Sequence, residues 1–199
     1  ITPIKTDDPF VILKHKNALF DYPLHFHNEY ELNLITNFTG KRTVGDSVEE
    51  INGIDLVLLG PDLKHFWKSC KPISGASVIT IQFQEHFLHS KIMSYSVSKD
   101  IKKLLELSKL GLSFSNPTKN IISNLLDSLD DNNTFKSLLI FLEILHTLSI
   151  SKDFKVLSSP PSANYNQKRE SRRISLVLKF IKDNYQKDIK LAQIAEIVS

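Results

Sequence analysis

The hydrophobic residues of this chain change their spacing near residue 96, and this change constrains the fold more than any other feature. Before it, short apolar or alternating runs occupy residues 11–13, 32–35, 56–59 and 78–81. After it, apolar residues recur every three to four positions. A period of two is typical of strands and a period of 3.6 of helices. The sequence therefore predicts an α+β protein, with strands first and helices after them.

Turn-forming residues separate the apolar runs of the first part. They are Thr39-Gly40, Gly45-Asp46, Asn52-Gly53 and Gly60-Pro61-Asp62. Short strands at intervals of about ten residues, with turn signals between them, are typical of a β-barrel or a β-sandwich.

Three helices are predicted in the middle of the chain. The first carries Ile101, Leu104 and Leu105 on one face and ends at Gly111, a residue suited to a left-handed cap. The second begins at Asn116-Pro117, with Asn116 as the cap. The third starts near Thr134, and its inward stripe is Phe135, Leu138, Leu139, Leu142, Leu145 and Leu148, to which Ile140, Phe141 and Ile144 add. A helix this apolar is buried, either in the core of one chain or in a subunit interface.

A linker is predicted over residues 153–170, where Ser158-Ser159-Pro160-Pro161-Ser162 is polar and rich in turn residues. Beyond it Ile174, Val177, Leu178, Ile181 and Tyr185 form one helical face, and Leu191, Ile194, Ala195 and Val198 form another. Two short helices cannot bury a sufficient core alone, so residues 171–199 are expected to be part of a larger helical domain.

Composition narrows the class of protein. Cys70 is the single cysteine in 199 residues, which excludes an internal disulfide and favours a reducing compartment. We see no signal peptide and no apolar run near the ~20 residues that a membrane helix needs. A cytoplasmic protein with no membrane partner is expected. The segment from Lys168 to Lys190 contains eight basic and three acidic residues. This excess of positive charge indicates either a solvated surface or attraction to a phosphate backbone.

Four polar residues are candidates for one site. On an extended strand His25 and His27 point to the same face, and Glu31 shares their parity. The fold must bring His65 to them. Three imidazoles and a carboxylate are a plausible ligand set for zinc, iron, nickel or manganese. Alternatively, these groups hydrogen-bond to one another or to a small ligand without a metal.

The sequence offers little for other kinds of catalysis. It contains no Gly-x-Ser-x-Gly elbow and no glycine-rich phosphate loop, and Cys70 has no evident base near it. Hydrolases and nucleotide-hydrolysing enzymes are therefore not expected.

Two stretches of the chain resemble the AraC family of transcription regulators. The first, His25-x-His27-x-x-Tyr30-Glu31-Leu32, then Gly45-Asp46 and Gly53-x-Asp55-Leu56-Val57-Leu58-Leu59-Gly60-Pro61-x-x-x-His65, looks like the family's cupin-type sensor domain. The second, Arg173-Ile174-Ser175-x-Val177-x-x-Phe180-Ile181-x-x-Asn184-Tyr185 and Ile189-Lys190-Leu191-Ala192-Gln193-Ile194-Ala195, looks like the start of its DNA-binding domain. Lys190 stands where that family often has a Ser or Thr helix cap, and Asp188 is a possible substitute.

The resemblance implies four regions. Residues 1–95 would form a cupin-like ligand-sensing barrel, 96–152 a helical dimerisation section, 153–170 a linker, and 171–199 the first two of seven helices of a double helix-turn-helix domain. The first recognition helix would follow Ser199.

The implied function is a ligand-responsive, DNA-binding transcription regulator that acts as a homodimer and is not an enzyme. Its small polar effector would contact His25, His27, Glu31, Arg42, His65 and Trp67, while Arg172, Arg173 and Lys190 would contact DNA. No cofactor is expected. The alternative is a metal-dependent cupin enzyme, an isomerase or dioxygenase, with His25, His27, Glu31 and His65 as metal ligands.

Overall fold

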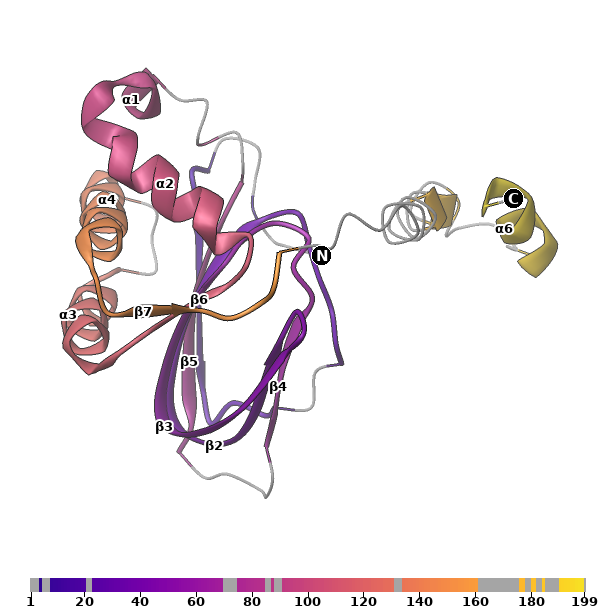
Figure 1. The fold of residues 1–199 in the computed structure, drawn as a ribbon, viewed down its shortest axis with the longest axis horizontal. Helices are drawn as coiled ribbons and strands as arrows, with labels where there is room; N and C mark the ends of the chain where they lie inside the picture. The colour runs from indigo at the N-terminus through magenta and orange to yellow at the C-terminus, as the bar shows by residue number, and fades with distance from the viewer. Residues whose placement is uncertain are drawn as a thin grey trace. The chain divides into compact units, whose positions relative to one another are not determined.

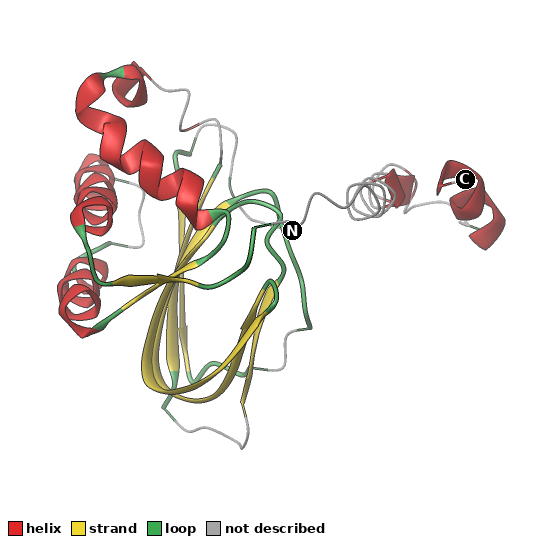
Figure 2. Ribbon diagram, viewed as in Figure 1, coloured by secondary structure: helices red, strands yellow, loops and turns green. Residues whose placement is uncertain are grey.

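A computed structural model describes residues 4, 8–20, 23–69, 75–84, 87, 91–130, 134–160, 176, 177, 180, 181, 184 and 190–198. The chain divides into two compact units, residues 1–159 and 160–199. Most of the described residues belong to the first unit, whose strands and helices Figures 1 and 2 show.

The first unit is built on an antiparallel sheet. Its strands are β1 (Val11–Lys16), β2 (Tyr30–Val44), β3 (Ser47–Leu59), β4 (His65–Ser69), β5 (Ser77–Phe83), β6 (Leu112–Phe114) and β7 (Phe154–Val156). The strand order is β1-β5-β2-β3-β6-β7, and β4 pairs with the far half of β2. The alternating and apolar runs of the sequence thus become strands, as predicted, and the mostly antiparallel sheet is consistent with a cupin-like fold.

The hairpin of β2 and β3 bends in its middle, where the pairing register shifts between Ile35 and Phe38. As a result, β2 pairs with β5 on one side of the bend and with β4 on the other. One apolar cluster joins Ile35 and Val78 near the first half to Val44 and Trp67 in the second. The sheet therefore curves around an interior, as Figure 1 shows.

Helices follow β5 in sequence and cover one face of the sheet. They are α1 (Lys91–Ser94), the 3-10 turn η2 (Ser96–Ser98), α2 (Lys99–Ser108), α3 (Asn116–Asp127) and α4 (Phe135–Ile150). Figure 1 shows α2, α3 and α4 on the same side of the sheet. The main core forms between them and the outer face of β2 and β5, where Leu32, Leu34, Ile81 and Phe83 meet Leu105, Ile122, Phe141, Ile144 and Leu148. Among the described residues, no helix has the length and apolar composition needed to cross a membrane.

The helix predictions are largely confirmed, with two corrections. Gly111 adopts a left-handed conformation after α2, with φ of 71°. The cap of α3 is Ser115 and not Asn116, which is already helical. In α4, Leu145 and Leu148 are buried as predicted, but Phe135 and Leu139 are 74% and 52% exposed. Phe141 and Ile144, which were predicted to add to the stripe, are buried in the main core with residues of β2 and β5.

Two predicted turns are strand residues. Thr39-Gly40 lies within β2 and Asn52-Gly53 within β3, and Thr39 pairs with Asn52 across the hairpin. Gly40 is required by a close approach, since a Cβ atom there would lie 2.3 Å from the carbonyl oxygen of Lys68 on β4. The predicted turns at Gly45-Asp46 and Gly60-Pro61-Asp62 are confirmed.

Two short strands interrupt regions predicted to be helical or irregular. β6 lies inside the predicted helical section 96–152, and β7 occupies the start of the predicted linker 153–170. β6 pairs with β3, and β7 pairs with β6, so both extend the sheet beyond β3. Runs of three residues are too short for their periodicity to distinguish a strand.

In the second unit the structure describes α6 (Leu191–Val198), which matches the last helix predicted. The backbone N–H of Lys190 donates to Oε1 of Gln193 at 3.0 Å, and the N–H of Gln193 donates to the carbonyl oxygen of Lys190 at 3.0 Å. This reciprocal pair caps the helix, while Asp188 lies outside the described residues. Leu191 is 82% exposed on this unit.

Candidate functional site

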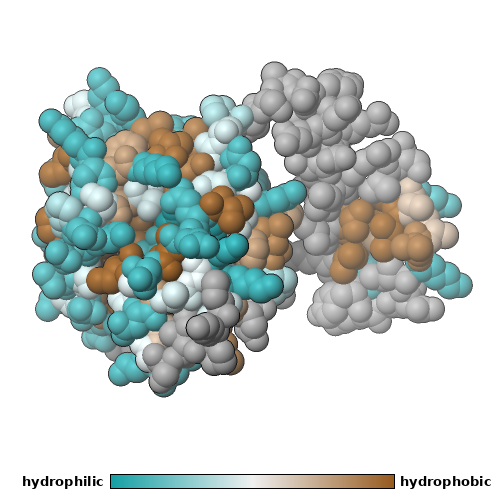
Figure 3. All heavy atoms as spheres, turned by 60° about the horizontal axis from the view of Figure 1, so that its bottom comes forward, coloured by the Kyte–Doolittle hydropathy of each residue, from teal (hydrophilic) through white to brown (hydrophobic). Residues whose placement is uncertain are grey.

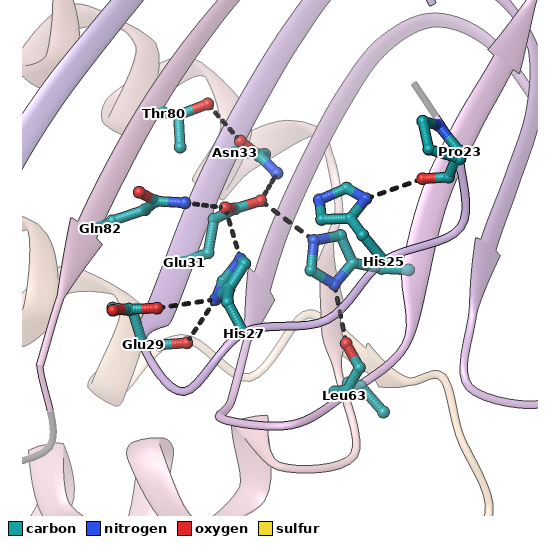
Figure 4. Close-up of polar contacts among 10 residues, drawn as sticks. Pro23, His25, His27, Glu29, Glu31, Asn33, Leu63, Thr80 and Gln82 are labelled. Carbon is teal, nitrogen blue, oxygen red and sulfur yellow. Dashed lines mark hydrogen bonds and ion pairs between the residues drawn. The ribbon is translucent and has the colours of Figure 1, made fainter. Parts of the chain in front are cut away.

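The candidate site is centred on Glu31, a buried carboxylate on the inner face of β2. Asn33 lies two residues further on the same face, and Gln82 and Thr80 stand opposite them on β5. Gln82 donates from Nε2 to Oε2 of Glu31 at 2.6 Å, and Asn33 donates to Oε1. Thr80 donates to Oδ1 of Asn33 at 2.5 Å. Figure 4 shows this chain of hydrogen bonds converging on Glu31.

These four polar side chains are all buried, with exposures of 5–8%. The intervening residues Leu32, Leu34 and Ile81 point to the opposite face and pack in the main core. The period of two therefore gives β2 and β5 an apolar face toward the helices and a polar face toward the interior. Burial of polar and charged groups costs free energy unless they are paired. Apolar side chains at these four positions would serve the stability of the sheet equally well, so stability does not explain the polar residues.

Three histidines lie beside this row. His27 precedes β2, His65 begins β4, and an isolated bridge pairs His25 with His65. The Nε2 atom of His27 lies 2.9 Å from Oε2 of Glu31, and Nε2 of His65 lies 3.5 Å from Oε1. The ring of His65 is centred 4.3 Å from that of His25 and 5.1 Å from that of His27. The structure thus brings together His25, His27, Glu31 and His65, as the sequence predicts.

Backbone carbonyls fix the orientation of all three rings. Each Nδ1 atom lies within hydrogen-bond distance of a carbonyl oxygen two residues away: Pro23 for His25 at 3.0 Å, Glu29 for His27 at 3.1 Å, and Leu63 for His65 at 2.8 Å. A carbonyl oxygen only accepts, so Nδ1 must carry the proton in each ring. The second nitrogen, Nε2, is then the atom available to the site.

The charges of the site follow from burial and from these contacts. Burial lowers the pKa of His27, but the hydrogen bond and charge of Glu31 and the charge of Glu29 outweigh it and raise the pKa above its usual value. Burial opposes ionisation of Glu31, but His27, the charge of His65 and the Gln82 hydrogen bond lower its pKa to about 2. Burial lowers the pKa of His65 to about 4, against the charge of Glu31.

At neutral pH the site therefore combines a negatively charged group with a neutral one. Glu31 is a carboxylate, and His65 is a neutral imidazole whose Nδ1 carries its proton. The Nε2 atom of His65 is buried and has no hydrogen-bond partner among the described residues. Such a set can accept hydrogen bonds from a polar molecule or supply ligands to a cation.

The donor set partly fits a metal ion. One nitrogen from each of His25, His27 and His65 lies within 4.8 Å of the other two. In a tetrahedral site with Zn–N bonds of about 2.0–2.1 Å, the nitrogens would be roughly 3.3 Å apart, so the rings would have to close inward. The Nδ1 hydrogen bonds to carbonyls are the outer contacts that metal-binding histidines usually have. Glu31 is engaged by His27, Asn33 and Gln82 instead of facing an open centre.

Arg42 and Trp67, the other two predicted ligand-binding residues, belong to a second buried network. The guanidinium of Arg42 donates to Asp55 at 2.5 Å, to Glu49 at 2.9 Å and to Ser113 at 3.1 Å. The indole N–H of Trp67 donates to the other oxygen of Asp55 at 2.8 Å. Since these polar groups are occupied within the protein, both side chains connect strands of the sheet in this structure. The ring of Trp67 still reaches the site, 6.0 Å from that of His65.

The predicted DNA-binding residues are only partly described. Lys190 is exposed at the start of α6. Arg172 and Arg173 lie outside the described residues, so their contribution to DNA binding stays a prediction.

Sequence reasoning missed Asn33, Thr80, Gln82 and Glu29. The first three alternate with apolar residues in strands that were correctly predicted, as Leu32-Asn33-Leu34 and Thr80-Ile81-Gln82 show. With Glu31 as a candidate, the same period of two would have placed Asn33 on its face. The pairing of β2 with β5 was needed to add Thr80 and Gln82.

Together, the curved antiparallel sheet and the histidine-rich cluster on its inner face are consistent with a cupin-like fold. The chain matches no protein-family model and no curated protein sequence.

Solved structures give a partial likeness. ToxT from Vibrio cholerae, an AraC-family regulator, aligns with 94% of this chain and 70% of its own at 15% identity and a TM-score of 0.45. ToxT with a bound unsaturated fatty acid aligns with 94% of this chain and 68% of its own, at 11% identity and a TM-score of 0.39. A cupin 2 conserved barrel domain protein from Rhodopseudomonas palustris aligns with 41% of this chain and 67% of its own, at 16% identity and a TM-score of 0.27. Values this low assign neither a ligand nor an activity to the chain.

Proposed function

We propose that this protein is a ligand-responsive, DNA-binding transcription regulator of the AraC type, cytoplasmic and homodimeric, and not an enzyme. In this proposal a small polar effector binds at His25, His27, Glu31 and His65. The observation that carries the proposal is the buried charged cluster of His27, Glu31 and His65 on the inner face of the sheet. A cluster of this kind with shifted pKa values is more typical of a binding site than of a core.

Each residue of the cluster would have its own role in effector binding. Glu31 and the Nε2 atom of His65 would accept hydrogen bonds from hydroxyl or amine groups of the effector. His27 would donate to it if the effector replaced Glu31 as its partner. We leave Arg42 and Trp67 out of the direct contacts, because their donors are already used by Asp55, Glu49 and Ser113.

Regulation requires that the effector favour one arrangement of the protein over another. The arrangement that the effector controls is proposed to be a dimer. Its interface would form through α3 and α4, which expose Ile121, Phe135 and Leu139. Exposed hydrophobic residues form patches among hydrophilic ones on the surface of the first unit, one face of which Figure 3 shows. Two linked DNA-binding units would bind paired half-sites more tightly than one.

The test is DNA binding by the protein made from its full reading frame. Electrophoretic mobility shifts on the DNA upstream of its own gene should show a sequence-specific complex that survives competition by unrelated DNA over a range of salt. A complex that unrelated DNA competes away equally well would contradict the proposal.

A metal-dependent cupin enzyme is the second candidate, and the convergence of three histidine nitrogens within 4.8 Å favours it. If a metal bound there, His25, His27 and His65 would hold it through Nε2, and the metal would supply Lewis-acid or redox chemistry. Elemental analysis of the purified protein separates the candidates. One ion per chain, lost in His27→Ala and His65→Ala, would favour the enzyme; a metal-free protein that binds DNA would favour the regulator.

A further inference from the structure

The segment by which the chain leaves the first unit is held against the sheet by specific hydrogen bonds. The N–H of Leu157 donates to the carbonyl oxygen of Gly111 at 2.9 Å, and that of Ser158 to Leu110 at 2.8 Å. One carboxylate oxygen of Asp46 accepts from the hydroxyl of Ser158 at 3.0 Å and from the N–H of Ser159 at 2.9 Å. These residues directly precede the boundary between the two units, after Ser159.

The turn Gly45-Asp46, which joins β2 to β3, fits closely against this segment. Gly45 has a φ of 58°, and a Cβ atom there would lie 2.2 Å from the hydroxyl oxygen of Ser158. Only glycine meets both conditions without displacing the segment. We call Gly45, Asp46, Ser158 and Ser159 the exit clasp.

The loop of residues 60–64 also contacts the exit clasp. The N–H of Gly45 donates to the carbonyl oxygen of Lys64 at 2.8 Å. The Leu63 side chain packs in one apolar cluster with Leu157 and Val44. A movement of this loop therefore changes the packing of Leu157 and the position of Gly45 together.

The same loop is tied to the candidate site by His65. The Nδ1–H of His65 donates to the carbonyl oxygen of Leu63 at 2.8 Å, and its Nε2 atom lies 3.5 Å from Glu31. The ring is 1% exposed, so it cannot turn without moving its neighbours. The Nε2 atom of this imidazole thus points toward the histidine cluster, and its Nδ1 atom is bonded to the loop.

We propose that His65 and the loop 60–64 couple the histidine cluster to the exit clasp, so that a group bound at Nε2 of His65 changes how firmly residues 157–159 are held. The two states are the closed clasp seen here and an open clasp, in which Asp46 has released Ser158 and Ser159. A ligand that reorients His65 has different affinities for these states, which is the requirement for control. The inference deepens the proposed function and rests on it, in that the cluster is taken as the effector site.

The coupling can be tested without an effector or DNA, by amide hydrogen exchange at Ser158 and Ser159. His65→Asn keeps an amide donor near the position of Nδ1, whereas His65→Gln moves the donor to the position of Nε2. We expect exchange to become roughly tenfold faster in His65→Gln, the change expected from loss of one hydrogen bond, and to stay near the wild-type rate in His65→Asn. Asp46→Ala, which opens the clasp directly, gives the upper limit of the rate.

Equal acceleration in both His65 variants, or acceleration in neither, would overturn the proposal. The amides of β2 and β5 report whether a variant has lost its global fold. If His65→Gln has lost its global fold, Leu63→Ala is used in its place. Faster exchange at Ser158 and Ser159 in Leu63→Ala, with unchanged exchange of the β2 and β5 amides, supports the coupling. Unchanged exchange at Ser158 and Ser159 refutes it. These outcomes do not depend on DNA binding, so failure here is distinct from failure of the proposed function.

Discussion

The Nε2 atom of His27 lies 2.9 Å from Oε2 of Glu31, and the two side chains are only 15% and 7% exposed. Each residue shifts the pKa of the other toward the charged form, upward for His27 and downward for Glu31. A charged pair inside the sheet stabilises the fold less than apolar side chains of similar volume often do. We therefore attribute its presence to binding.

Replacement of Glu31 by Gln should lower the pKa of His27. The variant keeps the volume of the side chain but removes the negative charge, so burial becomes the dominant influence on the imidazole. We expect the free energy of unfolding to fall by roughly 1–3 kcal/mol, because the amide cannot satisfy all the donors that face Glu31. NMR titration of the His27 ring measures the first effect and urea denaturation the second. An unchanged His27 pKa would show that Glu31 does not set its charge.

The metal-free protein should lose stability as the pH falls below neutrality. The unfolded chain binds a proton at His65 near pH 6.5, but the folded protein does so only near pH 4, so the free energy of unfolding decreases over this interval. The shift corresponds to a loss on the order of 3 kcal/mol. Glu31 extends the loss from pH 4.5 to about 2, since its folded pKa is depressed. His27 has the opposite sign: its raised pKa adds stability below pH 6.5 that is lost as the pH rises through the folded value.

Urea denaturation between pH 6.5 and 4, in the presence of a chelator, checks this dependence. His65→Asn removes the titrating imidazole and should flatten the curve. Parallel curves for the variant and the wild type would rule out His65 as the cause.

Replacement of Arg42 by Ala should destabilise the fold strongly. Arg42 is 1% exposed, and its loss would leave Asp55, also 1% exposed, without its ion pair. Removal of one partner of a buried pair typically costs about 3–5 kcal/mol. Lys155→Ala is the matched control, because it removes an exposed partner of Glu49 and should cost less than about 1 kcal/mol. Similar losses for both variants would contradict the structural role assigned to Arg42.

A charge on α4 should dissociate the proposed dimer. Leu139 is 52% exposed on the helix predicted to contact a second subunit, so Leu139→Glu should shift the sedimentation of the protein from dimer to monomer. Val48→Glu, at a residue 63% exposed on β3, introduces the same change away from the helices and should leave the dimer intact. Dissociation by Val48→Glu alone would place the interface on the sheet.

Local patterns in the sequence predicted most of the fold. The apolar and alternating runs located parts of β2, β3 and β5, and the period of 3.6 located α4. The structure adds that Thr134 caps α4, since its side chain accepts from the N–H of Ser137. Local patterns failed where distant segments decide the structure. Gly40 resembles a turn residue, but the close approach of the paired strand β4 explains the glycine. β6 and β7 form because the edge of β3 is available for pairing, and a local stretch of sequence cannot reveal such an edge.

The candidate site was predictable to the same extent. His25, His27, Glu31 and His65 were identified from spacing and resemblance, and the structure assembles them. The sequence did not show that Arg42 and Trp67 both donate hydrogen bonds to the carboxylate of Asp55, which leaves them as structural residues. Thr80 and Gln82 could not be assigned to the site from sequence, because their partners Asn33 and Glu31 lie 47 and 51 positions away in the chain and the pairing of β5 with β2 depends on the whole sheet.

The most direct test of the proposed function is fluorescence anisotropy of labelled upstream DNA with the protein made from its full reading frame, alone and with a panel of sugars, sugar acids and amino acids. The account predicts that at least one compound changes the Kd for specific DNA by about fivefold or more, within the usual range of allosteric coupling. It also predicts that Glu31→Gln abolishes this change while it retains DNA binding without the compound. An equal response in Glu31→Gln and the wild type would contradict the assignment of the effector site, and the absence of any specific DNA complex would contradict the proposed function.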